Sequence, residues 1–315
     1  MVQGVPLTVL SLHPTRDVIL DVPDLALGGV NRARSWFSYP AGKALNAART
    51  AGMLGGDARA LLLAPPHWAG LLGEFLGRFG VSFVHLPVEG EGRVCVMLNR
   101  GKMETVINTD YQLKPGPRLI SRLLGLVMKV AEKPGFLVVS GSLPPTMSDS
   151  GFRALLRIAG SGAARLVLDV SGARLRTGIL FRPWLIKPNL SEFRALVGGS
   201  AASVSGLLAA AHGLRQRGVG RILLSLGDRG CLLASPGGDW YVPPVRATYP
   251  VMSPVGCGDA LLGAFLRAIA GGAPEAVALH WGVAAATANL AHPGACLMSP
   301  AEIRAALPKV RLKKA

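Results

Sequence analysis

A short glycine-rich segment beside an acidic residue is the part of this 315-residue chain best suited to chemistry. It reads Gly256-Cys257-Gly258-Asp259, and a helix is predicted over Asp259–Ala270. Glycines allow several N–H groups to point inward, and the positive end of the helix dipole then favours an anion there. Asp259 either caps the helix or removes a proton from a hydroxyl that attacks a phosphoryl group. Cys257 is interpreted as a small filler, because no histidine stands near it in sequence.

Two other predicted helix starts carry polar residues that suit a ligand. Lys43 opens the helix predicted over 42–54. A lysine beside the positive end of a helix is unfavourable unless an anion is near, so it either binds an anion or is simply exposed. Asn189 and Glu192 lie one turn apart on one helix face. They either help to hold a ligand, or Asn189 caps the helix predicted over 190–197.

Strand and helix patterns alternate along most of the chain and must position these residues. Strands are predicted over 5–12, 58–63, 136–140, 166–170, 184–187, 222–226 and 230–234. Further helices are predicted over 70–79, 151–159, 204–216 and 274–291. This order is typical of an α/β, doubly wound, mostly parallel sheet with helices on both faces.

Two early regions fall outside the alternation. One is a strand predicted over 18–22, and the other is a hairpin of 93–99 and 104–108 around the turn Arg100-Gly101-Lys102. We expect segments of about 14–40 and 92–110 to form a small β-sheet lid.

The composition excludes a disordered chain, because half of the residues are hydrophobic and only 17% are charged. A formal net charge of +16 suits anionic ligands, but drift in composition explains most of it equally well. The four cysteines form no CxxC pair, which predicts free thiols in a reducing compartment. No signal peptide or membrane span is predicted, so a cytoplasmic protein is expected.

The segment Gly256–Asp259 resembles the Gly-Ala-Gly-Asp signature of the ribokinase-like, PfkB-type carbohydrate kinases. The segment Ala41–Asn46 is similar to that family's N-terminal Gly-Gly-Lys-Gly-x-Asn. Three further segments match in the family's order, namely 140–145, 187–192 and 225–230. Five ordered matches over most of the chain are far more specific than one. The resemblance implies a ribokinase-like fold with ATP and Mg²⁺ as cofactors.

Other segments resemble the phosphosugar branch of the family, which includes 1-phosphofructokinase and tagatose-6-phosphate kinase. These segments are 12–17, 29–33, 92–96 and 183–187. The chain departs from the branch pattern at His13, Ala44, Cys95, Met97 and Thr146. Ala44 is expected to crowd a loop that approaches the substrate, because it replaces a glycine. These departures leave the identity of the sugar open.

The resemblance implies a role for each matched position. The catalytic segment is Gly256, Cys257, Gly258 and Asp259, with Asp259 as the base. The implied substrate-binding residues are Asp17, Arg32, Gly42, Lys43, Asn46, Arg93 and Ser142. The implied ATP-binding residues are Lys187, Asn189, Ser225, Gly227 and Gly230, and Glu192 holds Mg²⁺ through water. Within this set Lys43 and Arg93 would bind the phosphate already on the sugar.

The predicted protein is a single kinase domain over 1–315 that phosphorylates a ketohexose phosphate. Fructose 1-phosphate is the preferred acceptor, and fructose 6-phosphate and tagatose 6-phosphate are the alternatives. Expected partners are ATP and a small sugar phosphate, in a monomer or homodimer, without a membrane or nucleic acid. Two other classes are considered: a degenerate kinase that acts as a sensor, and a nucleic-acid binder suggested by the charge alone.

Overall fold

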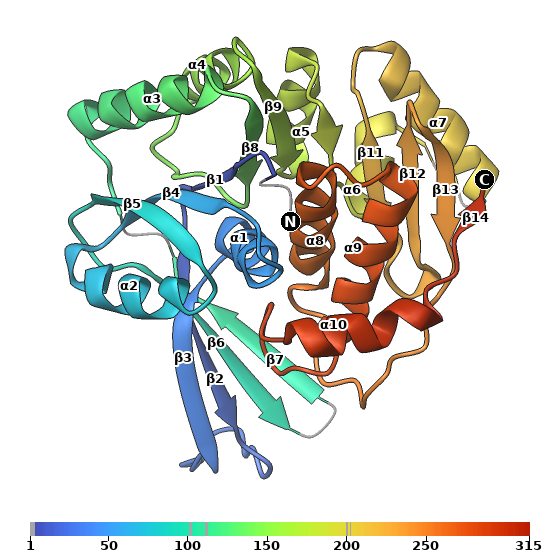
Figure 1. Cartoon of the computed structure of the whole chain (residues 1–315). Helices are drawn as coiled ribbons and strands as arrows, with labels where there is room; N and C mark the ends of the chain where they lie inside the picture. The colour runs from blue at the N-terminus through green and yellow to red at the C-terminus, as the bar shows by residue number, and fades with distance from the viewer. Residues whose placement is uncertain (1–3, 101–102, 111–112, 200, 202) are drawn as a thin grey trace.

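A computed structural model describes residues 4–100, 103–110, 113–199, 201 and 203–315. A ten-stranded sheet forms its centre (Figure 1). In spatial order the strands are β14 (Lys313–Lys314), β13 (Gly238–Val242), β12 (Cys231–Ser235), β11 (Ile222–Ser225), β10 (Leu185–Ile186), β9 (Ala164–Asp169), β8 (Gly135–Ser140), β1 (Leu7–Ser11), β4 (Ala58–Ala64) and β5 (Val81–Pro87). The strands from β11 to β5 are parallel, and β12, β13 and β14 are added antiparallel.

Helices cover both faces of this sheet, as predicted. One face packs against α1 (Lys43–Met53), α2 (Ala69–Gly77), α8 (Cys257–Ala270), α9 (Glu275–Asn289) and α10 (Pro300–Ala306). The other packs against α3 (Pro117–Ala131), α4 (Asp149–Ala159), α5 (Gly172–Gly178), α6 (Leu190–Val197) and α7 (Val204–Gln216). The central strands β1 and β8 are wholly buried, in agreement with their mainly apolar sequences LTVLS and GFLVVS.

Small residues bring α1 close to α8. A Cβ atom added at Gly263 of α8 would lie 2.3 Å from the carbonyl oxygen of Ala47 in α1, so only glycine fits. This contact matters for the site, because α1 and α8 carry Asn46 and Asp259 at their first turns.

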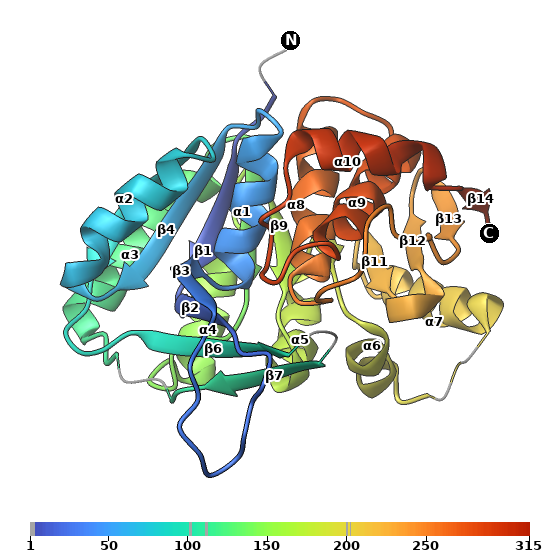
Figure 2. The ribbon, with the colours of Figure 1, turned by 90° about the horizontal axis from the view of Figure 1, so that it is seen from below.

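A separate four-stranded sheet has the order β3 (Ser35–Ala41), β2 (Thr15–Asp21), β6 (Arg93–Arg100) and β7 (Met103–Asn108). In Figures 1 and 2 it stands apart from the main sheet, beside the end of β1 from which the chain continues into β2. Its strands lie within the two segments predicted to form the lid. The predicted hairpin is present as the antiparallel pair β6–β7, and Gly101 and Lys102 of its turn lie outside the described residues. The strand β3 was not predicted.

Two further expectations were tested. Cys95, Cys231, Cys257 and Cys296 are all free cysteines, as predicted. In the described part of the chain no helix combines the length and apolar character needed to cross a bilayer.

Candidate active site

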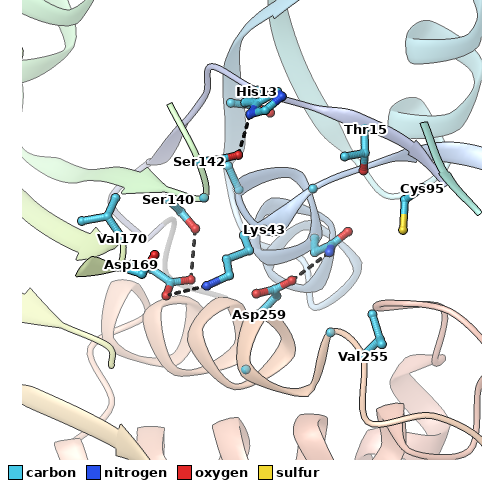
Figure 3. A pocket seen from close by; sticks show the side chains of 18 of the residues that line it. His13, Thr15, Lys43, Cys95, Ser140, Ser142, Asp169, Val170, Val255 and Asp259 are labelled. Atoms are coloured by element: carbon cyan, nitrogen blue, oxygen red, sulfur yellow. Dashed lines mark hydrogen bonds and ion pairs between the residues drawn. The ribbon is translucent and has the colours of Figure 1, made fainter. Parts of the chain in front are cut away.

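The carboxyl ends of the parallel strands open into a cavity of about 540 Å³. Ser11, Ser140, Asp169 and Ser225 end β1, β8, β9 and β11, and all four line it. The small sheet adds Thr15, Asp17, Arg93 and Cys95, and α1 and α8 add their first turns. Figure 3 shows several of these side chains, among them Thr15, Cys95, Ser140 and Asp169, facing one space from elements far apart in sequence. Ligands of open α/β sheets bind at this end of the strands.

The glycine-rich segment forms the start of α8. Gly256 is the N-cap residue and has a left-handed φ of 83°. A Cβ atom on Gly256 would lie 2.4 Å from the Cβ of Ala295, so both its conformation and its surroundings require glycine. A Cβ on Gly258 would lie 3.1 Å from Nζ of Lys187, which places that ammonium group over the same turn. The helix start therefore offers N–H groups and a lysine to an anion.

Asp259 is buried in the first turn of α8, and its side chain does not cap the helix. The capping interpretation is therefore wrong. Its Oδ2 accepts a hydrogen bond of 2.8 Å from Nδ2 of Asn46. Burial and the nearby Asp169 raise the pKa of Asp259 to about 6, against the lowering effects of Lys187, Asn46 and Lys43. A carboxylate poised near neutrality inside a cavity is suited to accept a proton.

Asp169 is a member of the site that the sequence analysis missed. It is almost completely buried at the end of β9, and its Oδ1 lies 3.2 Å from Nζ of Lys187 and 3.8 Å from Nζ of Lys43 (Figure 3). Ser140 Oγ donates a hydrogen bond of 3.1 Å to its Oδ2. The available signal was its position, since an acidic residue that ends a buried parallel strand points toward the ligand edge of the sheet.

The Asp169 carboxylate raises the pKa of Lys43 above its ordinary value. The side chain of Lys43 is 43% exposed, so this ammonium group is charged and still able to turn toward a ligand.

The small sheet contributes a second polar group of side chains. Asp17 is buried and receives a hydrogen bond of 2.7 Å from Thr15 Oγ1. Burial is the largest effect on Asp17 and raises its pKa. Arg93 Nη2 donates to Oδ1 of Asn108 at 2.8 Å. This side of the cavity thus pairs a hydroxyl-binding carboxylate with a guanidinium.

His13 and Ser142 line the same cavity as this polar group. His13 Nδ1 and Ser142 Oγ are 2.6 Å apart (Figure 3). Burial and the charge of Arg93 lower the pKa of His13 to about 4, so its ring is neutral at physiological pH. A neutral His13 ring can exchange a hydrogen bond with Ser142 without adding charge to the cavity.

A neighbouring cavity of about 560 Å³ is mostly apolar. It shares Asn189, Ser225 and Gly258 with the first cavity and also includes Gly227 and Gly230. Its apolar walls come from residues such as Pro243, Val245, Leu261, Val283 and Leu290. The first cavity therefore suits a polar ligand, and the neighbouring cavity suits a flat, apolar ring system.

Asn189 and Glu192 form a capping box at the start of α6. Asn189 Oδ1 accepts from the N–H of Glu192 at 2.8 Å, and Glu192 Oε2 accepts from the N–H of Asn189 at 2.9 Å. The capping alternative is therefore present. Both residues also line the first cavity, with Asp169 and Asp259. No cluster of three or more His, Cys, Asp or Glu side chains suitable for a metal occurs among the described residues.

The structure thus brings most of the candidate residues together. The first cavity is lined by Asp17, Gly42, Lys43, Asn46, Arg93, Ser142, Lys187, Asn189, Glu192, Ser225, Gly256, Gly258 and Asp259. Gly227, Gly230 and Cys257 line the second. Arg32 lies in an exposed loop between β2 and β3 and lines neither cavity.

Two positions that differ from the family signatures lie at the site. Ala44 belongs to α1 and is buried in the core, and it also lines the first cavity beside Lys43. Burial raises the pKa of Cys257 to about 11, and its Sγ lies 3.3 Å from the carbonyl oxygen of Ala286. Its thiol is thus held protonated, in agreement with a filler role.

Comparisons with known proteins show which family and fold the chain resembles. A family model described as pfkB family carbohydrate kinase matches residues 9–302. The ATP-dependent 6-phosphofructokinase isozyme 2 of Mycobacterium tuberculosis is 30% identical over 298 residues, covering 93% of this chain and 86% of that protein. The 1-phosphofructokinase of Escherichia coli is 26% identical over 269 residues, covering 82% of each. The structure of Escherichia coli phosphofructokinase-2 with substrates and products superposes with a TM-score of 0.86 at 25% identity, covering 96% of this chain and 99% of that chain.

Proposed function

The chain belongs to the pfkB family of carbohydrate kinases, and from this premise we propose that it transfers the γ-phosphoryl group of ATP to a ketohexose phosphate. The observation that carries the proposal is the buried Asp259 carboxylate, held by Asn46 at the start of α8 inside a cavity lined by Lys43 and Arg93. Asp259 takes the proton of the acceptor hydroxyl. The N–H groups that follow Gly256 then stabilise the charge on the transferring phosphoryl oxygens.

The small-sheet side of the cavity is the proposed sugar site. Asp17 accepts hydrogen bonds from sugar hydroxyls, and Asn46 adds a further polar contact. Lys43 and Arg93 bind the phosphate already on the sugar, with Ser142 and the backbone at Gly42 beside them. An acceptor without a phosphate would leave Lys43 and Arg93 without the anion that they are proposed to bind. Fructose 1-phosphate, which would yield fructose 1,6-bisphosphate, is the preferred acceptor; fructose 6-phosphate and tagatose 6-phosphate are the alternatives.

The family implies ATP as the second substrate, and the neighbouring apolar cavity is its proposed site. The adenine would lie between the apolar walls, with Ser225, Gly227 and Gly230 along its edge. The phosphates would extend past Asn189 to Lys187 and the start of α8.

The chemistry of the donor set fits Mg²⁺, because Asp169 and Glu192 place two carboxylates on the same cavity. Mg²⁺ is commonly held by one or two carboxylates together with water and phosphate oxygens. When bound, the ion would neutralise charge on the phosphates.

We propose that the small sheet acts as a lid and also joins two copies of the chain. Its inner face buries Thr15, Asp17 and Ile19, whereas Trp36 and Ile107 on its outer side are 64% and 52% exposed. An aromatic and an aliphatic side chain left open on a sheet favour a second copy as the covering partner. Light scattering on the purified protein should give a dimer, and Trp36→Glu should give a monomer. A wild-type monomer would contradict this proposal.

The decisive test of the function is ADP release with Mg-ATP and one acceptor at a time. The acceptors are fructose 1-phosphate, fructose 6-phosphate, tagatose 6-phosphate and unphosphorylated fructose. Turnover that requires the phosphate on the sugar would support the proposal and identify the substrate. Binding of ATP without turnover on any acceptor would indicate a sensor instead.

A further inference from the structure

Arg49 is a fully buried arginine in the middle of α1, and the proposed reaction gives it no role. Its guanidinium donates from Nη2 to Oδ1 of Asn46 at 2.8 Å and to the carbonyl oxygen of Ala295 at 2.5 Å. Its Nε and Nη1 have no hydrogen-bond partner among the described residues. Arginine remains charged in proteins, so this is a buried charge that the fold maintains at a cost.

An aromatic cage replaces the missing counter-ion. The guanidinium carbon lies 4.9 Å from the ring centres of Tyr39 and Phe75 and 5.5 Å from that of Phe79. Ring faces attract cations, but they fix the orientation of a guanidinium less strictly than a carboxylate would. The orientation of the Arg49 guanidinium is fixed by its hydrogen bonds to Asn46 and Ala295. The cage thus keeps the charge buried while its one well-directed side-chain bond points at Asn46.

That bond determines which way the Asn46 amide faces. Arginine has only donors, so the Asn46 atom beside it must be the carbonyl oxygen. The amide nitrogen of Asn46 is then directed to Asp259, as the 2.8 Å contact shows. In this orientation Asn46 can donate to an ionised Asp259, but it cannot accept a hydrogen bond from a protonated one.

We propose that Arg49 is a positioning residue that holds the Asn46 amide in the orientation that favours the carboxylate form of Asp259. The role rests on Asp259 acting as the base in the proposed function. Arg49 contacts neither substrate site and acts through Asn46.

The need for such a positioning residue follows from the other groups around Asp259. Burial and Asp169 favour the protonated form of Asp259, whereas Lys187 and Lys43 favour the carboxylate. Ionised thiolates at Cys257 and Cys296 would also favour the protonated form. Both lysines also pair with Asp169, and both face the proposed phosphates. The Arg49–Asn46 pair lies on the other side and keeps its orientation when the lysines turn to a substrate. On its own side Arg49 also faces Asp17, Tyr39 and Cys296, and its charge favours the ionised form of all three.

The test is the pH profile of kcat between about pH 5 and pH 9. Replacing Arg49 with methionine removes the donor and fills the aromatic cage with an apolar chain. Without Arg49 the Asn46 amide is free to turn and accept from protonated Asp259, so the acid limb should move up by about one unit. From a limb near 6, kcat at about pH 6.5 should fall roughly 3-fold from titration alone and recover near pH 9, with KM for ATP unchanged. Arg49→Lys, which keeps a charged donor, should move the limb by less than half as much.

Two controls separate positioning from packing. Arg221→Met removes another arginine stacked on an aromatic ring, 4.1 Å from the centre of Trp184, at the opposite end of the strands. It should lower the melting temperature without moving the acid limb. Asn46→Ala should move the limb by itself, and adding Arg49→Met to Asn46→Ala should move it no further, because the two residues act as one unit.

The role of Arg49 is refuted if Arg49→Met leaves the limb in place, or if the lysine and methionine variants shift it equally. It is also refuted if the two substitutions add independently. Should Arg49→Met fail to fold, Arg49→Leu, which also removes the donor, takes its place in the same comparison. Failure of the proposed function looks different: wild type would turn over no phosphosugar, or Asp259→Asn would retain turnover.

Discussion

Replacing Asp259 with asparagine should make the protein inactive and more stable at the same time. If Asp259 is the general base proposed above, its loss should lower kcat by roughly 10²–10⁴-fold, with ATP binding retained. The stability gain follows from burial. The pKa of Asp259 is raised from 3.8 to about 6, so the folded state holds this proton more tightly than the unfolded state does. Above about pH 6 the folded protein must therefore bear the cost of an ionised Asp259.

The size and pH dependence of this cost are set by the shift. About two units correspond to roughly 3 kcal/mol, or a few degrees in melting temperature for a chain of this size. The free energy of unfolding of Asp259→Asn, measured against wild type with urea, should exceed it by about this amount at pH 8. The difference should shrink as the pH falls through 6 and vanish below about pH 3, where the folded and unfolded states are both protonated. The exposed Asp24→Asn serves as the control and should show no such trend.

A variant that is less stable than wild type at pH 8 would refute the reasoning, even if it were inactive. So would a stability difference that does not change with pH. In either case Asp259 would be ionised in the folded protein without strain, and its basicity would need another explanation.

Three further predictions concern the rest of the site. Lys43→Ala should raise KM for the sugar phosphate roughly 10–100-fold, because it removes a charged hydrogen bond, and should leave KM for ATP within about 3-fold. The reverse pattern would show that Lys43 belongs to the ATP site instead of the sugar-phosphate site. Gly256→Ala should cost about 3 kcal/mol in urea unfolding, because it adds a clash with Ala295 to the strain of a positive φ. Gly272→Ala has a similar φ of 85° in open space and should cost only about 1 kcal/mol. His13→Asn should change the ratio of kcat/KM between sugar phosphates but leave its pH dependence from about 5 to 8 unaltered, because His13 is already neutral there.

The sequence predicted many of the elements, although α3 and β5 were missed. The bounds of α6 and α7 agree with the prediction, and α8 begins only two residues earlier than expected. The strand β3 was missed because Trp36, Phe37 and Tyr39 follow no simple alternation and Pro40 lies within the strand. The antiparallel strand β13 was missed because most of its residues are only half-buried, next to the short edge strand β14.

The site was predicted where a motif marked it and missed where only tertiary contacts define it. Lys43, Asn46 and Asp259 belong to segments recognised from sequence. Asp169 and Arg49 do not stand out in sequence: one ends an ordinary buried strand, and the other is one of many scattered arginines. Asp169 gains its role from two lysines on other elements, and Arg49 from rings on β3 and near α2. No local sequence pattern predicts such tertiary contacts.

The paired charges of the cavity imply that binding of the two substrates is coupled. Lys43 and Lys187 both pair with Asp169, and both are proposed to contact phosphates. When the lysines turn to phosphate oxygens, Asp169 loses its counter-charges and raises the pKa of Asp259 still further unless a cation replaces them. We infer that Mg²⁺ fills this need beside Asp169, and that sugar phosphate binding should tighten Mg-ATP but not metal-free ATP. In Asp169→Asn the lysines are already released, so calorimetry should show this coupling reduced; coupling of unchanged size would contradict the inference.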